Sequence, residues 1–348
     1  MGAMFRDKGL LAAGLVLLIA VGVMIPLYRQ AAQHDTTGED IYYAWLEGER
    51  IIKGENPYAR VLAGDMRENQ KYATYFPTFY WLSALSQLLG LRDFPPWIAF
   101  WRVIFLIFDL GIAALIFLAF YRERSILLGV LSALFWLFNR WTLVVLSIAH
   151  IDFLPLFFLL ASLLLFDKRR LFSLLLFSLS LSIKQLAIFL LPVYLLWVWQ
   201  AAGPEPTKRA KQLALASLTI LSVPVVTSLP FLVWNAEGWA KSLIFSVTRY
   251  AEDHFAAPSA ATLLGLIGIP AAAPMLGLSL LVYAGVLQQR IGRYTSVLLT
   301  MAVFLGFNAV LFRQYICWIL PFIPLTICDA KHRHGVERSA ARQEPQSS

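Results

Sequence analysis

The sequence predicts an all-α protein, a polytopic transmembrane helical bundle of about ten spans. Hydrophobic residues make up 59% of its 348 residues, and the mean hydropathy is +0.67. Charged residues make up only 14%, whereas soluble domains carry about 25%. Apolar runs of roughly 20 residues recur along the chain, as membrane helices require. They lack the alternation of apolar and polar residues that a membrane barrel needs.

Basic residues gather in six clusters between the apolar runs, and they account for most of the net charge of +8. Short loops rich in Lys and Arg are typical of the cytoplasmic face of membrane proteins. The excess charge therefore indicates topology, and we expect no nucleic-acid partner. The clusters are Arg6/Lys8, Arg122/Arg124, Lys168/Arg169/Arg170, Lys208/Arg209/Lys211, Arg290/Arg293 and Lys331/Arg333/Arg338/Arg342.

With all six clusters inside, both termini are cytoplasmic. The first span follows Arg6 and Lys8 and has no small-residue cleavage site, so we expect a retained signal-anchor. Residues 1–330 then form one membrane domain, and the polar, basic segment 331–348 is expected to be a disordered cytoplasmic tail. The ten expected spans are 9–28, 97–120, 126–146, 150–166, 171–186, 187–199, 213–233, 272–288, 294–312 and 314–328.

Two apolar segments need separate interpretation. Residues 75–91 are nearly long enough to cross, but a crossing there would invert every later basic loop. We expect an amphipathic or re-entrant segment on the outer face; the alternative is that it crosses and another weak segment does not. Residues 171–199 are expected to form two short helices, because Pro192 interrupts the run and Lys208 must return to the cytoplasm.

The two cysteines, Cys317 and Cys328, give no sign of redox or zinc chemistry. They lie eleven residues apart in one apolar run, which is about 16 Å along a helix. That separation is too large for a disulfide, and the sequence has no Cys-x-x-Cys or Cys/His metal pattern.

Two long polar stretches, 29–74 and 234–259, fall on the outer face of this topology. Charged residues near span ends are costly to bury in lipid, so those that gather on one face are candidates for function. The first stretch carries Asp40-Ile41-Tyr42-Tyr43 and Asn56-Pro57-Tyr58. The candidate site residues on this face are Asp40, Tyr42, Tyr43, Tyr58, His150, Asp152, Lys184, Arg249, His254, Arg313, Gln314 and Tyr315.

Each candidate also has a structural interpretation. Asp40 could be a solvated acid or a helix N-cap before Ile41. Lys184 could extend its ammonium to the lipid headgroups, and Arg313 could do the same or stack on an aromatic ring. The pair His150 and Asp152 could cap a span, and Arg102 with Asp109, on one face of another span, could be a structural pair.

The short motifs together resemble the glycosyltransferase-C superfamily, and within it the polyprenol-phosphate-mannose-dependent mannosyltransferases. The resemblance covers most of the chain, although Phe76-Pro77-Thr78 replaces the usual Tyr-Pro-Pro type of sequence. It rests on Asp40-Ile41-Tyr42, Gly54-Glu55-Asn56-Pro57-Tyr58, Tyr75-Phe76-Pro77, Asn139 through Asp152, Ser182-Ile183-Lys184 with Pro192, and Gln314-Tyr315 with Pro321.

The resemblance implies a glycosyltransferase-C-type bundle whose catalytic loop, 29–74, faces outward in a bacterial or archaeal plasma membrane. It also implies an inverting hexosyltransferase that uses a polyprenyl-phosphate-linked sugar, with mannose as the first candidate. The acceptor would be a glycolipid, a glycan or a protein; sugar, linkage and oligomeric state stay open.

Chemical reasoning then assigns roles within that reaction. Asp40 would be the general base. Charge developing on the phosphate requires cations, for which the candidates are Lys184, Arg313 and Arg249. The remaining candidates would bind or support the substrate. We expect no cofactor; Glu39, Asp40 and Asp152 could supply oxygen ligands to a divalent metal, but Lys and Arg alone can neutralise a phosphate.

Two other classes of protein also fit many apolar spans with few charges. A transporter or flippase of lipid-linked sugars would place functional charges near the membrane midplane, with access from both sides. A noncatalytic assembly subunit is a third class. The long outer stretch 29–74, rich in Tyr, Asp and Glu, favours an enzyme.

Overall fold

The computed structural model describes residues 2–64, 72–248, 259–266, 269–308 and 311–341, and the regular elements in these ranges are all helices, as the composition predicted. In chain order they are α1 (Gly2–Ala31), α2 (Asp40–Ile52), α3 (Arg60–Ala63), α4 (Thr78–Leu88), α5 (Phe94–Arg122), α6 (Ile126–Leu137), α7 (Arg140–Ser147), α8 (Phe153–Leu165), α9 (Arg170–Ile183), the 3₁₀ helix η1 (Gln185–Leu190), α10 (Leu191–Ala201), α11 (Pro206–Thr248), α12 (Ala260–Leu263), α13 (Ile269–Leu287), α14 (Arg293–Phe307), the 3₁₀ helix η3 (Arg313–Trp318) and α15 (Phe322–Ala341).

Three helical segments in the described ranges are long and apolar enough to cross a membrane. They are Gly9–Ala31, Phe94–Arg122 and Pro206–Ile244, and the pair α6 and α7, bent by 44°, would add a fourth as one broken span. The other apolar helices, among them α8, α9 and α14, have only 10–17 residues, whereas a crossing needs about 20. The long helices indicate a membrane protein, but the expected ten-span bundle is not confirmed.

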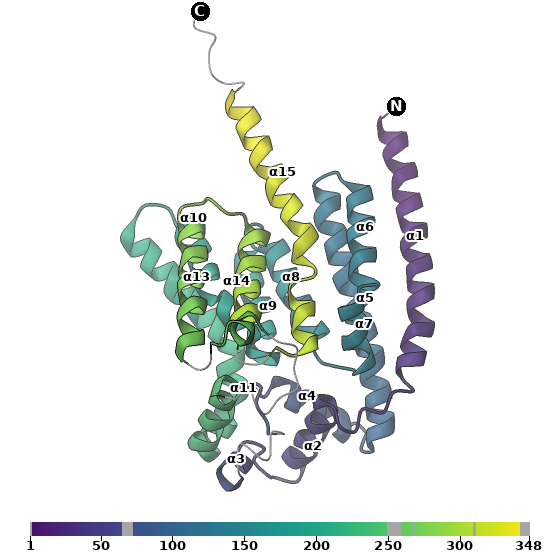
Figure 1. Cartoon of the computed structure of the whole chain (residues 1–348), viewed down its shortest axis with the longest axis vertical. Helices are drawn as coiled ribbons and strands as arrows, with labels where there is room; N and C mark the ends of the chain where they lie inside the picture. Colours follow the sequence, from purple (N-terminus) through teal and green to yellow (C-terminus); the bar gives the residue numbers. More distant parts are fainter. Residues whose placement is uncertain (1, 65–71, 249–258, 267–268, 309–310, 342–348) are drawn as a thin grey trace, which may run out of the picture.

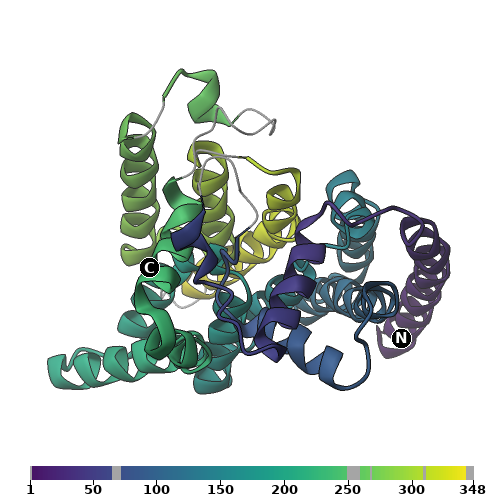
Figure 2. The ribbon, with the colours of Figure 1, turned by 90° about the horizontal axis from the view of Figure 1, so that it is seen from below.

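The helices that carry the motifs of the first polar stretch lie together at one end of the molecule. The start of α1 and the end of α15 lie at the upper end in Figure 1, and α2, α3 and α4 lie at the lower end. Seen from below, α2 lies near the middle and α1 at the edge (Figure 2). Helix α8 packs against both α5 and α9. The residues between α7 and α8 therefore come from the centre of the bundle.

Helix α4 holds the segment 75–91 against α2 rather than across the bundle. It has 11 residues, or about 16 Å of helix, roughly half of the hydrocarbon thickness. Gly48 allows the close packing, because a Cβ at this position would lie 2.8 Å from the backbone nitrogen of Ala84. By its length α4 does not cross a membrane alone, and the amphipathic or re-entrant interpretation stays a prediction.

The expected division of 171–199 into two helices is confirmed. Helix α9 ends at Ile183, Lys184 is extended (φ −147°, ψ 118°), and η1 and α10 follow. Pro192 lies in the first turn of α10, where its missing N–H breaks no helical hydrogen bond. The proline thus marks the restart, whereas the break itself falls at Lys184.

Three expected segments differ in the structure. The stretch 234–259 was expected to be a polar loop, but it is helical through Thr248: α11 bends at Asn235, whose Oδ1 accepts from Gly238 N at 2.8 Å and so restarts the helix. The expected last span 314–328 is divided into η3 and α15. The expected disordered tail is helical as far as Ala341, since α15 continues past residue 331.

The buried polar residues of α5 have separate partners. Arg102 donates to the carbonyl oxygen of Leu146 at 3.3 Å. Asp109 accepts from Trp136 Nε1 at 2.7 Å and from the Tyr28 hydroxyl at 3.3 Å. Asp109 thereby ties α1, α5 and α6 together, which is a structural role. Cys317 and Cys328 are both free thiols, as their spacing predicted.

Candidate active site

Asp40 is the first residue of α2 and is partly exposed. Glu39, whose backbone is extended, occupies the N-cap position, so the interpretation of Asp40 as the N-cap is wrong. A carboxylate in the first helical turn is stabilised by the helix dipole. The Asp40 side chain is 35% exposed, so it is accessible from solvent.

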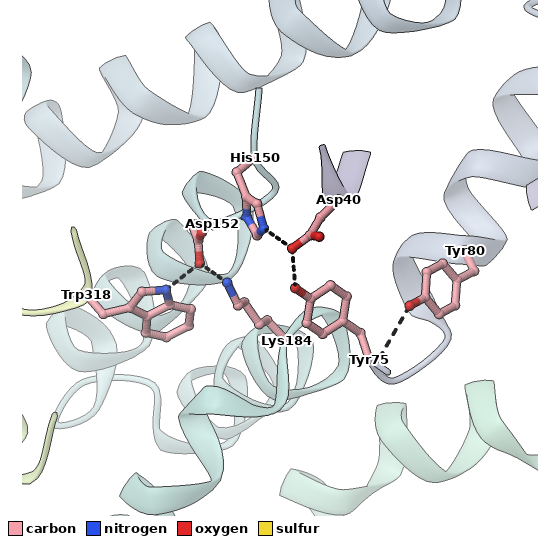
Figure 3. Close-up of polar contacts among 7 residues, drawn as sticks. All are labelled: Asp40, Tyr75, Tyr80, His150, Asp152, Lys184 and Trp318. Carbon is pink, nitrogen blue, oxygen red and sulfur yellow. Dashed lines mark hydrogen bonds and ion pairs between the residues drawn. The ribbon is translucent and has the colours of Figure 1, made fainter. Parts of the chain in front are cut away.

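Two side chains from other elements contact one oxygen of Asp40 (Figure 3). Nε2 of His150 lies 3.2 Å from Oδ2, and the hydroxyl of Tyr75 donates to the same Oδ2 at 3.4 Å. Tyr75 is itself held from two sides, because its carbonyl accepts from the Tyr58 hydroxyl at 2.7 Å and its N–H donates to the Tyr80 hydroxyl at 3.3 Å. Tyr58 therefore supports Tyr75 and is fully buried behind it.

His150 is positioned by a tight reversal between α7 and α8, outside the candidate spans. Ala149 has a φ of 51°, a left-handed conformation that costs a non-glycine residue about 1–2 kcal/mol. His150 N donates to Val145 O at 3.1 Å and Ala149 N to Leu146 O at 3.2 Å, which is the Schellman pattern of a helix end. The reversal turns His150 inward, where it is 2% exposed.

The two ring nitrogens of His150 each face a carboxylate. Nδ1 lies 2.7 Å from Oδ2 of Asp152, and Nε2 faces Asp40. Only the imidazolium carries a proton on both nitrogens. Burial by itself would lower the pKa of His150, but Asp152 and then Asp40 outweigh burial and the repulsion from Lys184, so the pKa lies above its usual value.

Asp152 is fully buried and has cationic and neutral donors on its other oxygen. Lys184 Nζ and Trp318 Nε1 both donate to Oδ1 at 2.5 Å. Burial by itself would raise the pKa of Asp152, but the charges of Lys184 and His150 hold it below the usual value. Asp152 occupies the N-cap position of α8 without a capping side-chain hydrogen bond, so its carboxylate serves this cluster instead.

Lys184 is 1% exposed, which makes the interpretation of a side chain reaching to the headgroups wrong. Its ammonium lies 5.1 Å from the ring centre of Tyr315 and 5.7 Å from that of Tyr75, within range of cation–π attraction. Asp40, His150, Asp152 and Lys184 thus form a row in which acidic and basic side chains alternate, which we call the charge array. Its outer end, Asp40, is partly exposed and its inner end is sealed.

The structure brings Asp40, His150, Asp152, Lys184 and Tyr315 together, with Tyr58 behind Tyr75. The other described candidates make contacts of their own outside this cluster or lie beside it in sequence. The ring of Tyr42 packs against that of Phe94, with ring centres 4.9 Å apart. It also contacts the ring of its neighbour Tyr43, with ring centres 5.7 Å apart. Arg313 begins η3 and is exposed, whereas Gln314 is buried. Arg249 and His254 lie outside the described residues.

Two residues of the site were not singled out from the sequence. Tyr75 stood in the Tyr75-Phe76-Pro77 motif without a role of its own, and Trp318 was one of many tryptophans. The motif offered a signal for Tyr75. For Trp318 there was none, because an indole in an apolar run reads equally well as a core or membrane-belt residue.

Within the described ranges, no group of three or more His, Cys, Asp or Glu side chains is placed to hold a metal ion.

No protein-family model and no curated protein matches this sequence. Chemically, the arrangement offers a partly exposed carboxylate with a buried imidazole beside it and a sealed ion pair of Asp152 with Lys184 behind.

Proposed function

We propose that the chain is a membrane hexosyltransferase that moves a sugar, with mannose the first candidate, from a polyprenyl phosphate to an acceptor hydroxyl at the extracytoplasmic face. One observation carries the proposal: Asp40, the residue that the resemblance to glycosyltransferase-C enzymes selects as the base, is the partly exposed end of the buried charge array. Perturbed, buried charges of this kind cluster at functional sites.

The reaction needs one base and no covalent nucleophile. The acceptor hydroxyl gives its proton to the Asp40 carboxylate while its oxygen forms a bond to the anomeric carbon. The bond from that carbon to the phosphate oxygen breaks, and its electron pair leaves with the polyprenyl phosphate. A single displacement of this type inverts the anomeric centre. General-base catalysis contributes about 10²–10⁴-fold to such a step.

The leaving phosphate needs a cation that is not already engaged inside the protein. Lys184 already pairs with Asp152 and is sealed, so its expected phosphate role stays a prediction that the geometry does not favour. Arg313 is exposed at the start of η3, the element whose Trp318 reaches Asp152. A guanidinium can hold a phosphate by two parallel hydrogen bonds, which makes Arg313 the preferred candidate, with Arg249 as a second.

The experiment replaces Asp40 with Asn and measures sugar transfer in liposomes. The donor is a radiolabelled polyprenyl phosphate mannose, and transfer to lipid, glycan and protein acceptors is followed. We expect Asp40→Asn to lose at least about 100-fold in turnover while donor binding is kept. The matched control is Glu39→Gln, which removes the neighbouring acid and should transfer normally.

Near-normal transfer by Asp40→Asn would remove Asp40 from the base role. Movement of intact lipid-linked sugar across the bilayer, without cleavage and with equal rates for both variants, would favour a transporter instead.

A further inference from the structure

We infer that His150 is a positioning residue, held as an imidazolium between the carboxylates of Asp40 and Asp152, which fixes the base and keeps it ionised. The inference rests on the proposed function, since it gives His150 a task in that reaction. His150 does not meet the reacting atoms itself, because it is buried beneath Asp40. Its effect passes through the carboxylate.

The two short contacts of the ring with carboxylate oxygens favour the protonated state of His150. The Asp40 oxygen lies 3.2 Å from Nε2, and the Asp152 oxygen lies 2.7 Å from Nδ1. A neutral imidazole has one N–H, so one of its nitrogens would turn a lone pair toward a carboxylate. In a buried site such an arrangement is strongly unfavourable. The imidazolium places its charge against both carboxylates, with Nε2 at hydrogen-bond distance from Asp40 and Nδ1 in a close ion-pair contact with Asp152.

The charged and titratable groups around the ring also favour the cation. Two acids contact the ring directly, and the cation that the described part of the chain places nearby, Lys184, is directed at the far oxygen of Asp152. The remaining neighbours are neutral donors or thiols. By element, the groups of this cluster are Asp40 of α2, Asp152 before α8 and Lys184 after α9. Tyr75 before α4 contacts Asp40, Tyr315 of η3 lies near Lys184, and Cys317 of η3 lies near Asp152.

The two oxygens of Asp152 have different partners, and this arrangement fixes the imidazole ring. Its Oδ2 faces His150, whereas its Oδ1 accepts from Lys184 and Trp318. The carboxylate therefore cannot rotate without losing two hydrogen bonds, and this holds the plane of the imidazole. A cation fixed beside Asp40 stabilises its ionised form, which is the form that accepts a proton.

The kinetic test compares His150→Gln with the unaltered chain across pH. The Gln amide can still donate to Asp40 but carries no charge. We expect a fall in kcat with little change in KM for the donor, and a shift of the acid limb of kcat/KM to higher pH by about 1–3 units. The limb at alkaline pH, where the imidazolium loses its proton, should disappear. An acid limb that stays in place would overturn the positioning role.

The direct test is nitrogen NMR of ring-labelled histidine in the full chain in nanodiscs. The sequence has five histidines, and the His150 signals are those that His150→Gln removes; His34→Gln, which alters an exposed ring, is the control. We expect both ring nitrogens of His150 to be protonated at neutral pH, and a neutral tautomer would overturn the inference. This readout needs no activity. If His150 is an imidazolium but the chain transfers no sugar, the proposed function is contradicted and the inference about His150 is not. If the ring is neutral in a chain that transfers sugar, the inference is contradicted and the proposed function is not.

Discussion

Nε2 of His150 lies 3.2 Å from Oδ2 of Asp40, although 110 residues separate them in the chain. The contact joins the first residue of α2 to the reversal between α7 and α8. The sequence motif around each residue does not by itself bring the two side chains together. The candidate site is therefore a property of how the lower-end helices dock on the bundle, and changes that loosen the docking should affect it.

Stability should fall as pH rises above the ordinary pKa of histidine. The folded-state pKa of His150 is raised by Asp152 and Asp40, despite burial, from a reference value of 6.5. The stabilisation is complete below that reference value and is lost as pH rises through the raised folded value. Thermal unfolding in detergent at neutral to alkaline pH measures it. The decline should be smaller in His150→Gln and unchanged in the control His34→Gln; equal slopes in all three would contradict the expectation.

Replacing Asp152 with Asn should be strongly destabilising. The variant leaves the Lys184 ammonium buried without its counter-ion, which costs about 3–5 kcal/mol. The double variant Asp152→Asn with Lys184→Met should recover much of that loss, because it removes the orphaned charge. Thermal unfolding of the set gives the comparison.

A control for this series is Asp167→Asn. Asp167 also pairs with a cation, Arg293, but its side chain is 73% exposed, and exposed pairs contribute about 1 kcal/mol or less. If Asp152→Asn cost no more than Asp167→Asn, the buried pair would not hold the site together.

Gly48→Ala should loosen α2 from α4. The new Cβ would lie 2.8 Å from both Ala84 N and Gln87 Nε2, and backbone cannot move aside as a side chain can. We expect a loss of about 1–3 kcal/mol, together with a fall in transfer because Tyr75 and Asp40 shift apart. In the control Gly277→Ala, a helical glycine with open space around it, both measurements should hold. If Gly48→Ala left both the unfolding temperature and the turnover unaltered, the space between α2 and α4 at this position would have to be wider than the structure shows.

Composition and charge pattern were enough to predict an all-helical membrane protein, and Pro192 with Lys208 was enough to predict the two helices in 171–199. The number of spans was not predictable in the same way. Hydropathy counts apolar residues, but an extended residue such as Lys184 or a split such as η3 and α15 shortens the helix that those residues form.

The members of the charge array were predictable as candidates, but their pairing was not. A sequence shows that His150, Asp152 and Lys184 lie near span ends; it does not show which charges meet, since that depends on packing between distant helices. The positive φ at the reversal belongs to Ala149 rather than to a glycine, so the sequence gives no sign of it. Lys184 was expected to meet a phosphate because the charge that develops on the leaving group requires a cation, whereas in the structure its ammonium pairs with Asp152.

The hydrogen bond from Trp318 to Asp152 has a consequence for how the protein is made. Asp152 emerges from the ribosome long before residue 318, 166 positions later, so α7 and α8 are synthesised while this acid still lacks one of its donors. The hydrogen bonds of Asp152 are therefore completed only when the last tenth of the chain is synthesised. A premature stop before Trp318 would therefore leave the three longest apolar helices intact. The buried carboxylate of Asp152 would still lack this hydrogen-bond donor.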